Sequence, residues 1–383
     1  MPREIFVNIC NNKTMPAICF VAPTAYPLIS KDPTHNFIGG AELQQIILAR
    51  TLVKRGYKVS MICMDHGQQD QIVVDGITIY RAYRPNEGIP ILRFIYPRLT
   101  SVWAQMKKAN ADIYYQRSAG MLTGIVAKFC KKYKKKSIYA GASNDDFLKK
   151  TPKIKYRRDS ILFEYGIRNV NQIIVQNQTQ KTLLESNYGV NSVIIPSGHT
   201  QPGFSCNNKS GYILWVANIR KVKRPQLIIA LAKRLPMYQF KMVGGPTPGE
   251  EALYKQIEHK AQQQNNVEFI GFVPIVEVEK HFDGARIVIN TSESEGFPNT
   301  FLQAWSRMIP TVSFIDCGAY ASDGTEISDR VNTLDKMQAV IEELMQNNQI
   351  WLKKGSKANA YCMEMHSIDS VVSRLINIIE DIH

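Results

Sequence analysis

The sequence predicts an α/β protein made of two doubly wound domains that face each other across a cleft. Two observations lead to this prediction. Short apolar segments alternate with amphipathic helical segments along the 383 residues, a pattern typical of parallel sheets covered by helices on both faces. The alternation stops at residues 197–210, which are rich in Gly, Ser and Asn, and then restarts. We therefore expect an N-terminal domain at 1–196, a linker at 197–210 and a C-terminal domain at 211–365.

The N-terminal domain begins with the apolar segment AICFVA at residues 17–22, which predicts a strand. The sequence GGAELQQIILARTLVKRG then predicts a helix that ends at Gly56. One face of this helix would contain Leu43, Ile46, Ile47, Arg50 and Val53. A second helix is expected at 119–132 and a third between the last two strands. Further strands are expected at 57–63, 112–117, 137–140, 172–176 and 192–196.

The C-terminal domain repeats the same order of elements. Strands are predicted by GYILWVA, YQFKMVGG, VEFIGFV, RIVIN and TVSF. Helices are expected at 224–234, 250–263 and 299–308, and the chain should be helical beyond Leu334. In open parallel sheets, ligands bind outside the carboxyl ends of the strands. The cleft between the two domains is therefore the expected site.

Composition excludes several classes of protein. Hydrophobic residues make up 44% and charged residues 21% of the chain, so it is not mostly disordered, collagenous or coiled-coil. No transmembrane run and no signal peptide are evident, which predicts a cytoplasmic protein. The seven cysteines form no CxxC motif, and the seven histidines show no ligand spacing. We expect neither disulfides nor a metal, and no cofactor.

The positive charge lies in the first half of the chain. Residues 1–196 hold 28 Lys and Arg against 13 Asp and Glu, whereas residues 197–383 hold 19 against 20. Basic clusters occur at 128–136 and 149–158. Such a surface can attract anionic lipid at the inner face of a membrane, or an acidic acceptor. A solvated helix end is the alternative. Nucleic acid is not expected, because no nucleic-acid-binding motif accompanies the charge.

Three motifs lie at predicted strand ends. The first is Gly39-Gly40-Ala41-Glu42 at the start of a helix. Two glycines let a ligand approach the backbone closely, and a helix N-terminus suits phosphate. The motif is neither GxGxxG nor a Walker A loop, and glycines at a loop–helix junction often serve the turn alone.

The second motif follows the strand ILWVA and runs from Asn218 to Pro225. It holds four cations, Arg220, Lys221, Lys223 and Arg224. These cations repel one another unless an anion or solvent offsets them, and a diphosphate would do so. An exposed basic loop is the alternative.

The third motif, TSESEGFPNTFLQAW, spans residues 291–305. Gly296 permits a tight turn that can direct Glu295 into the cleft, and Gln303 can flank the same ligand. Backbone N–H groups near Asn299 and Thr300 can point at an anion. An acidic turn that only caps an ordinary helix is the alternative.

Taken together, these residues resemble the retaining nucleotide-sugar glycosyltransferases of family four (glycosyl transferases group 1), which have the GT-B fold of two Rossmann-like domains. The resemblance runs over nearly the whole chain and is strongest at GYILWVANIRKVKRPQLIIALAKRLP, NVEFIGFVP and NTSESEGFPNTFLQAWSRMIPTVSF. It implies that the helix at 366–383 returns to the N-terminal domain. It also implies catalytic roles for Glu295 on the donor sugar and for Lys223 and Arg220 on the diphosphate. The remaining donor-side residues would be Gly39, Gly40, Asn218, Gly244, Phe272, Val273, Gly296, Phe297, Pro298, Asn299, Thr300 and Gln303.

The chain departs from the family pattern at several positions. Gln303 replaces the second glutamate of the motif, which usually holds the ribose hydroxyls. Asn218 replaces the usual diphosphate arginine, although Arg220 is close enough to substitute. Where many members place a histidine beside the reacting sugar, this chain has Ser143 followed by Asn144, Asp145 and Asp146, which become acceptor-side candidates. The Asp145–Asp146 pair is also a candidate cation site.

The expected function is sugar transfer from a nucleotide-diphosphate-sugar donor to an acceptor hydroxyl with retention. The acceptor would be a glycan or a lipid-linked molecule, in the synthesis of cell-surface polysaccharide or glycolipid. Three alternatives stay open: a sugar-phosphate synthase or phosphorylase-like enzyme of the same fold, a catalytically silent nucleotide-sugar-binding subunit, and a membrane-surface adaptor.

Overall fold

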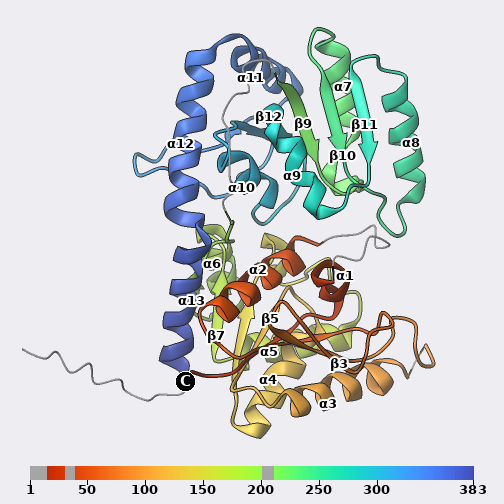
Figure 1. Ribbon diagram of the computed structural model, residues 1–383, viewed down its shortest axis with the longest axis vertical. Helices are drawn as coiled ribbons and strands as arrows, with labels where there is room; N and C mark the ends of the chain where they lie inside the picture. The colour runs from red at the N-terminus through yellow and green to blue at the C-terminus, as the bar shows by residue number, and fades with distance from the viewer. Residues whose placement is uncertain (1–14, 31–38, 91, 201–210) are drawn as a thin grey trace, which may run out of the picture.

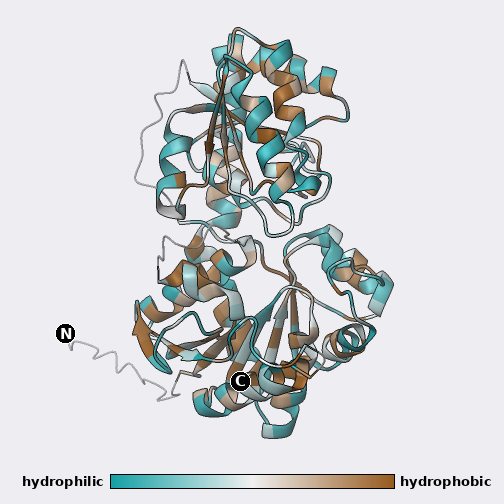
Figure 2. Cartoon of the chain, turned by 90° about the vertical axis from the view of Figure 1, so that its right-hand side faces the viewer, coloured by the Kyte–Doolittle hydropathy of each residue, from teal (hydrophilic) through white to brown (hydrophobic). Residues whose placement is uncertain are grey.

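The computed structural model describes residues 15–30, 39–90, 92–200 and 211–383. These residues form two lobes, one above the other, each with a central sheet between helices (Figure 1). The strands at the centre of each lobe are mostly apolar, whereas the helices also present hydrophilic residues (Figure 2). Both lobes are therefore α/β units with buried sheets, as the sequence predicts. Within the predicted linker, residues 201–210 lie outside the described part of the chain.

The N-terminal lobe has an eight-stranded sheet in the order β3-β4-β2-β1-β5-β6-β7-β8. All its strand pairs are parallel except β3–β4. The strands are β1 Ile18–Val21, β2 Val59–Cys63, β3 Gln71–Val74, β4 Ile77–Arg81, β5 Ile113–Arg117, β6 Lys136–Ala140, β7 Gln172–Val175 and β8 Val193–Ile194. The order reverses between β1 and β5, so the carboxyl ends of these strands flank the topological switch point.

Six α-helices are described in this lobe: α1 Tyr26–Ile29, α2 Gly40–Lys54, α3 Thr100–Ala109, α4 Met121–Tyr133, α5 Arg157–Asn169 and α6 Gln178–Tyr188. The β3–β4 hairpin was not predicted, although its Asp75-Gly76 turn, with φ of 52° and 78°, is the usual two-residue hairpin signal. The predicted core face of α2 was wrong in part. Its most buried apolar residues include Leu48, Ala49 and Leu52, because α2 lies between the sheet and α13.

The C-terminal lobe has a six-stranded parallel sheet in the order β11-β10-β9-β12-β13-β14. Its strands are β9 Tyr212–Val216, β10 Phe240–Val243, β11 Val267–Gly271, β12 Ala285–Asn290, β13 Thr311–Ser313 and β14 Asp329–Arg330. Its helices are α7 Gln226–Arg234, α8 Glu251–Gln262, α9 Ile275–Asp283, α10 Asn299–Trp305, α11 Leu334–Gln346 and α12 Asn348–His366. Here the order reverses between β9 and β12, which places the switch point at those two strands.

Two helices are shorter than predicted, each for a local reason. Helix α7 begins after Arg224, whose φ of 46° interrupts the helical backbone. Helix α10 ends at Trp305 rather than residue 308. Pro310 disfavours helical geometry at Ile309, and Ile309 N donates to Ala304 O to close the helix end.

The C-terminal segment connects the two lobes. Helix α12 lies along the C-terminal lobe, and α13 (Ile368–Ile382) continues beside the N-terminal lobe (Figure 1). Val371, Val372 and Leu375 of α13 belong to the same apolar core as α2 and β1. The break between the helices is at Ser367, where the chain pairs with His199 of the linker. The tail therefore contributes to the core of the lobe that it returns to.

The junction between the lobes holds two histidines. His366 is 1% exposed, and its Nδ1 lies 2.7 Å from Ser197 O. His199 Nε2 lies 3.1 Å from Ser306 Oγ, and its backbone bonds to residues 366 and 368. Burial lowers the pKa of each ring to about 4, despite nearby Glu279 in the case of His199. Both rings are therefore neutral in the folded protein near pH 6.

We expect the protein to lose stability as the pH falls from 6.5 towards 4. The unfolded chain binds protons on these histidines in that window and the folded chain does not, at about 1.4 kcal/mol per pH unit for each ring at most. Urea unfolding at pH 7 and pH 5 measures this change. His366→Gln should show a shallower dependence on pH than the wild type. Equal stability of the wild type at both values would contradict the prediction.

The described cysteines, Cys19, Cys63, Cys130, Cys317 and Cys362, are buried and unpaired. Among the described helices, none has the length and apolar character needed to cross a membrane.

Candidate active site

A cleft with a volume of about 490 Å³ lies between the lobes, at the carboxyl ends of both sheets. One wall comes from the loops after β9, β10 and β12, together with the start of α10. The other wall comes from the start of α2 and the loops after β5 and β6. The cleft therefore lies where both switch points meet.

The loops after β9 and β12 are fastened to each other. Arg224 Nε donates to Thr291 O at 2.7 Å, and its NH2 donates to Ser292 O at 3.2 Å. In return, Thr291 Oγ1 donates to Lys223 O at 2.6 Å, and Glu293 N donates to Val222 O at 2.8 Å. These bonds fix the two loops that carry Lys223 and Glu295.

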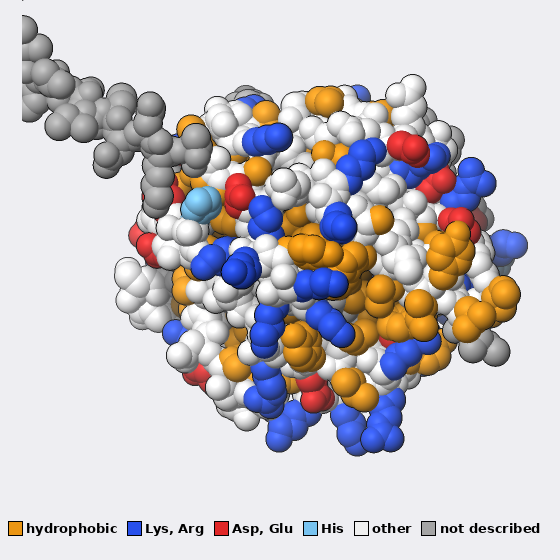
Figure 3. Space-filling model, turned by 90° about the horizontal axis from the view of Figure 1, so that it is seen from below, with side chains coloured by type: hydrophobic (Ala, Val, Ile, Leu, Met, Phe, Trp, Pro, Cys, Tyr) orange, Lys and Arg blue, Asp and Glu red, His pale blue; other side chains and the backbone are white. Residues whose placement is uncertain are grey.

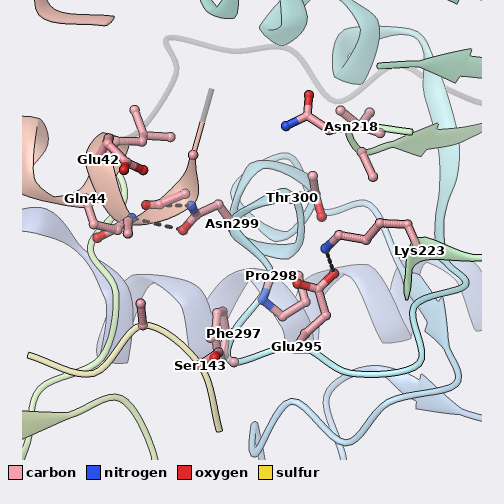
Figure 4. Close-up of a pocket in the computed structure, with 18 of the residues that line it drawn as sticks. Glu42, Gln44, Ser143, Asn218, Lys223, Glu295, Phe297, Pro298, Asn299 and Thr300 are labelled. Atoms are coloured by element: carbon pink, nitrogen blue, oxygen red, sulfur yellow. Dashed lines mark hydrogen bonds and ion pairs between the residues drawn. The ribbon is translucent and has the colours of Figure 1, made fainter. Parts of the chain in front are cut away.

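Lys223 and Glu295 form an ion pair in this wall of the cleft (Figure 4). Their side chains are 17% and 16% exposed. The same carboxylate oxygen, Oε1, also accepts from Ser292 Oγ at 2.7 Å and from Asn290 Nδ2 at 3.2 Å. Burial alone raises the pKa of the Glu295 carboxyl group, but Lys223 and these two hydrogen bonds reverse the effect and lower it. Glu295 is therefore an anion held in a fixed orientation.

The four cations of the 218–225 loop have different surroundings. Arg220 and Lys223 line the cleft, and Arg220 forms no ion pair with a residue that the structure describes. Lys221 is exposed, and Arg224 points into the protein, where it binds backbone carbonyl groups and stacks 4.7 Å from the Phe314 ring centre. The sequence does not distinguish the roles of the four cations, and the structure shows that Arg224 braces the loop. Two cations remain for a ligand.

Two glycines of the site have no room for a side chain. A Cβ on Gly244 would lie 1.7 Å from Ala217 O, because the loops after β9 and β10 pack backbone to backbone there. A Cβ on Gly296 would lie 2.5 Å from Ala142 O in the other lobe. Gly296 thus lets the Glu295 loop contact the opposite wall of the cleft.

Asn299 joins the two walls. Its Oδ1 accepts from Gln44 Nε2 at 3.0 Å, and its Nδ2 donates to Gly40 O at 3.4 Å (Figure 4). Gln44 also exchanges two hydrogen bonds with the backbone of Gly198 in the linker, at 2.8 and 2.9 Å. A Cβ on Gly40 would lie 2.8 Å from Asn299 Nδ2. Gly40 at the start of α2 therefore lets the two lobes approach each other closely.

Gln303 lies beside a carboxylate that the sequence does not indicate. Its Nε2 donates to Glu279 Oε1 at 2.7 Å, and Arg307 NH2 lies 2.8 Å from Glu279 Oε2. Arg307 is also paired with Asp283, at 2.7 Å. The Glu279 carboxylate is thus in direct contact with Gln303, which occupies the position of the second glutamate of the family motif.

The opposite wall contains two cations, Arg117 and Lys153. Arg117 is the last residue of β5, at the switch point, and its NH2 lies 3.5 Å from Ser197 Oγ. Lys153 Nζ is 2.5 Å from Asp146 Oδ1. No carboxylate among the described residues pairs with Arg117.

The acceptor-side candidates are only partly brought together. Asp145 lines the cleft, and Ser294 Oγ donates to it at 3.5 Å across the two lobes. Asn144 does not line the cleft. Asp146 is fully buried and accepts from Ala142 N at 2.7 Å and Ser143 N at 3.3 Å, so its acceptor-side assignment was wrong. Asp146 caps the turn and pairs with Lys153. Two adjacent aspartates in a sequence do not show that one of them is buried in this way.

The other predicted site residues all line the cleft: Gly39, Gly40, Asn218, Arg220, Lys223, Gly244, Phe272, Val273, Glu295, Gly296, Phe297, Pro298, Asn299, Thr300 and Gln303. Their roles toward a ligand stay predictions. Gln44, Arg117 and Lys153 were missed. Arg117 ends the apolar strand segment DIYYQR, so a charged residue at a strand end was the signal available. In the described ranges, no group of three His, Cys, Asp or Glu side chains could hold a metal ion.

Two family models match the chain. Glycosyltransferase Family 4 matches residues 38–199, and Glycosyl transferases group 1 matches residues 201–322. No curated protein matches the sequence.

Several solved structures are similar in fold. HepE of Anabaena, in complex with UDP and glucose, is 15% identical with a TM-score of 0.72, over 96% of this chain and 100% of that one. Sucrose-phosphate synthase from Thermosynechococcus elongatus is 14% identical with a TM-score of 0.75, over 96% and 98%. The pneumococcal O-GlcNAc transferase GtfA, in complex with UDP and GlcNAc, is 13% identical with a TM-score of 0.65, over 96% and 99%. These structures have the GT-B fold, and so does this chain.

Gly244→Ala should destabilise the protein by about 1–3 kcal/mol, because the new methyl group would overlap the backbone of Ala217 and one of the two loops would have to move. Gly120→Ala is the matched control, since a Cβ there meets nothing within 4 Å. Urea unfolding of both variants tests the prediction. Equal stability of the two variants would show that the loops after β9 and β10 are not tightly packed.

Proposed function

We propose that this chain, which belongs to the glycosyltransferases with the GT-B fold, transfers a sugar from a nucleotide-diphosphate donor to an acceptor hydroxyl with retention at the anomeric carbon. One observation carries the proposal. The Lys223–Glu295 pair lies at the switch point of the C-terminal lobe together with Arg220, which forms no ion pair within the described part of the chain. A diphosphate needs positive charge, and the adjoining sugar needs a group that accepts hydrogen bonds from its hydroxyls. This wall of the cleft offers both, side by side.

The residues divide the chemistry between them. As the bond to the donor sugar breaks, negative charge develops on the leaving diphosphate. Lys223 and Arg220 stabilise that charge, and the backbone N–H groups at the start of α10 stabilise it further. Glu295, kept ionised, accepts hydrogen bonds from sugar hydroxyls. In the front-face route that the resemblance implies, the leaving phosphate takes the proton of the acceptor hydroxyl, so the protein supplies no nucleophile.

The contacts between the lobes support this mechanism. Asn299, Gln44 and Gly40 hold the start of α10 against α2, and Gly296 allows the Glu295 loop to touch the opposite wall. A closed cleft excludes water and so limits hydrolysis of the donor. We propose that the side-chain cations provide the positive charge, without a metal or cofactor. The acceptor, a glycan or lipid-linked molecule, would enter along the wall that contains Ser143 and Asp145.

A second candidate is a sugar-phosphate synthase. The observation that favours it is Arg117, a cation without a carboxylate partner among the described residues, on the wall where the acceptor would lie. Lys153 is the second cation there. Arg117, together with Lys153 that is paired with Asp146, gives this wall positive charge that suits an anionic acceptor. Comparing a sugar phosphate with the corresponding unphosphorylated sugar as acceptor separates the two candidates.

Lys223→Ala should lower kcat/KM for the donor by about 10²–10³-fold, the effect expected when one donor of charge stabilisation is removed. The assay is transfer and hydrolysis with UDP-, GDP- and ADP-sugars. Lys221→Ala removes an exposed cation of the same loop and should leave kcat/KM near the wild-type value. Turnover by Lys223→Ala at the wild-type rate would contradict the proposal. Donor binding by the wild type without any turnover would instead identify a silent binding subunit.

Gln303→Glu, which restores the family residue, should weaken donor binding and lower stability. The new carboxylate would face Glu279, which lies 2.7 Å from the Gln303 amide, and like charges at that distance repel. Adding Glu279→Gln should recover donor affinity. Calorimetry with the preferred nucleotide sugar measures both effects. Tighter donor binding by the single Gln303→Glu variant would contradict this, because it would show that Glu279 does not take the place of the carboxylate that Gln303 lacks.

A further inference from the structure

The chain between β4 and α3 exposes large apolar side chains. Ile89 is 65% exposed, Leu92 and Ile95 are each 56% exposed, and Tyr96 is 70% exposed. Burying such side chains is favourable by about 1.5–3 kcal/mol each, so four exposed together indicate a surface that meets something apolar.

The start of α5 adds to the same surface. Tyr156 is 61% exposed and Ile161 is 60% exposed. Arg158 joins the two segments, because its guanidinium lies 4.1 Å from the Phe94 ring centre and 5.1 Å from that of Tyr156. We call this surface the apolar patch and define it as Ile89, Leu92, Phe94, Ile95, Tyr96, Tyr156 and Ile161.

Basic residues flank the Tyr156 part of the apolar patch along the chain. Lys149, Lys150, Lys155 and Arg157 are exposed, and Asp159, the one acidic residue at 148–161, is paired with Arg158 at 3.1 Å. Helix α4 packs against α5 and ends in the lysine-rich sequence 128–136, which contains no acid. Seen from the end of the N-terminal lobe, apolar side chains gather in a strip bordered by many Lys and Arg and few Asp and Glu (Figure 3).

We propose that the apolar patch docks on an anionic membrane surface, with its aliphatic and aromatic side chains among the lipid headgroups and its lysines and arginines on the lipid phosphates. Tyrosine and aliphatic side chains favour the headgroup boundary, and each nearby Lys or Arg adds about 1 kcal/mol of attraction to anionic lipid. The excess of positive charge around the patch favours an anionic lipid surface over a second copy of the chain, whose own positive charge would repel it.

The patch is close to the cleft along the chain. Lys153 lines the cleft wall, and Tyr156 of the patch follows three residues later, which is at most about 11 Å of extended chain. On the proposed function, docking would hold the acceptor wall near the lipid phase, so that an acceptor with a lipid anchor could reach the cleft.

Co-sedimentation with vesicles tests the docking. The probes are vesicles of phosphatidylcholine alone and of phosphatidylcholine with 30% phosphatidylglycerol as a chosen composition, at low and high salt. The variant carries Leu92→Ser and Tyr96→Ser, and its matched control carries Met237→Ser and Leu352→Ser, two side chains of the C-terminal lobe that are 66% and 49% exposed. Circular dichroism verifies that both are folded.

We expect the wild type and the control to bind the anionic vesicles at least tenfold more tightly than the neutral ones. The Leu92/Tyr96 variant should lose at least tenfold in that binding, while its donor hydrolysis stays at the wild-type level. Failure of the wild type to bind anionic vesicles at low salt would overturn the proposal. Equal binding by the variant, or a wild-type dimer in solution that the variant abolishes in the absence of vesicle binding, would also overturn it. Each result is independent of donor turnover.

Discussion

The ion pair between Lys223 and Glu295 is the interaction on which the site depends. Each residue belongs to a loop at the end of its own strand, and β9 and β12 are neighbours only because the strand order reverses there. Arg224 and Thr291 fasten these loops, so the two charges are held in place before any ligand arrives. A preorganised pair of this kind costs little reorganisation when charge develops beside it.

The second constraint is how the lobes meet. Helix α13 supplies core residues to the N-terminal lobe, and the chain passes from one lobe to the other at Ser367. At the cleft itself the contact is made by small or polar groups, with Gly296 against Ala142 and Asn299 against Gln44. Such contacts are weak enough to separate, whereas the helical connection keeps the lobes in register. We therefore expect the two lobes to move relative to each other about this connection.

Much of this could be predicted from the sequence, because alternating apolar strands and amphipathic helices determine a doubly wound lobe and its strand ends determine the site. What was missed depends on where side chains point. Nothing in the sequence distinguishes Arg224, which braces a loop, from Arg220, which faces the cleft. Asp146 resembles an exposed acid and is a buried cap. Glu279 is distant from Gln303 in sequence and adjacent in space. The excess of Lys and Arg in the first half of the chain indicated an anionic binding partner. The residues of the apolar patch, however, have no periodicity that would predict their exposure.

The most direct test is a crystal structure of the protein with a nucleotide sugar bound. We expect the diphosphate within hydrogen-bond distance of Lys223 Nζ and the Arg220 guanidinium, with a sugar hydroxyl on the Glu295 carboxylate. Phosphates bound away from both cations, or a sugar that leaves Glu295 untouched, would contradict it.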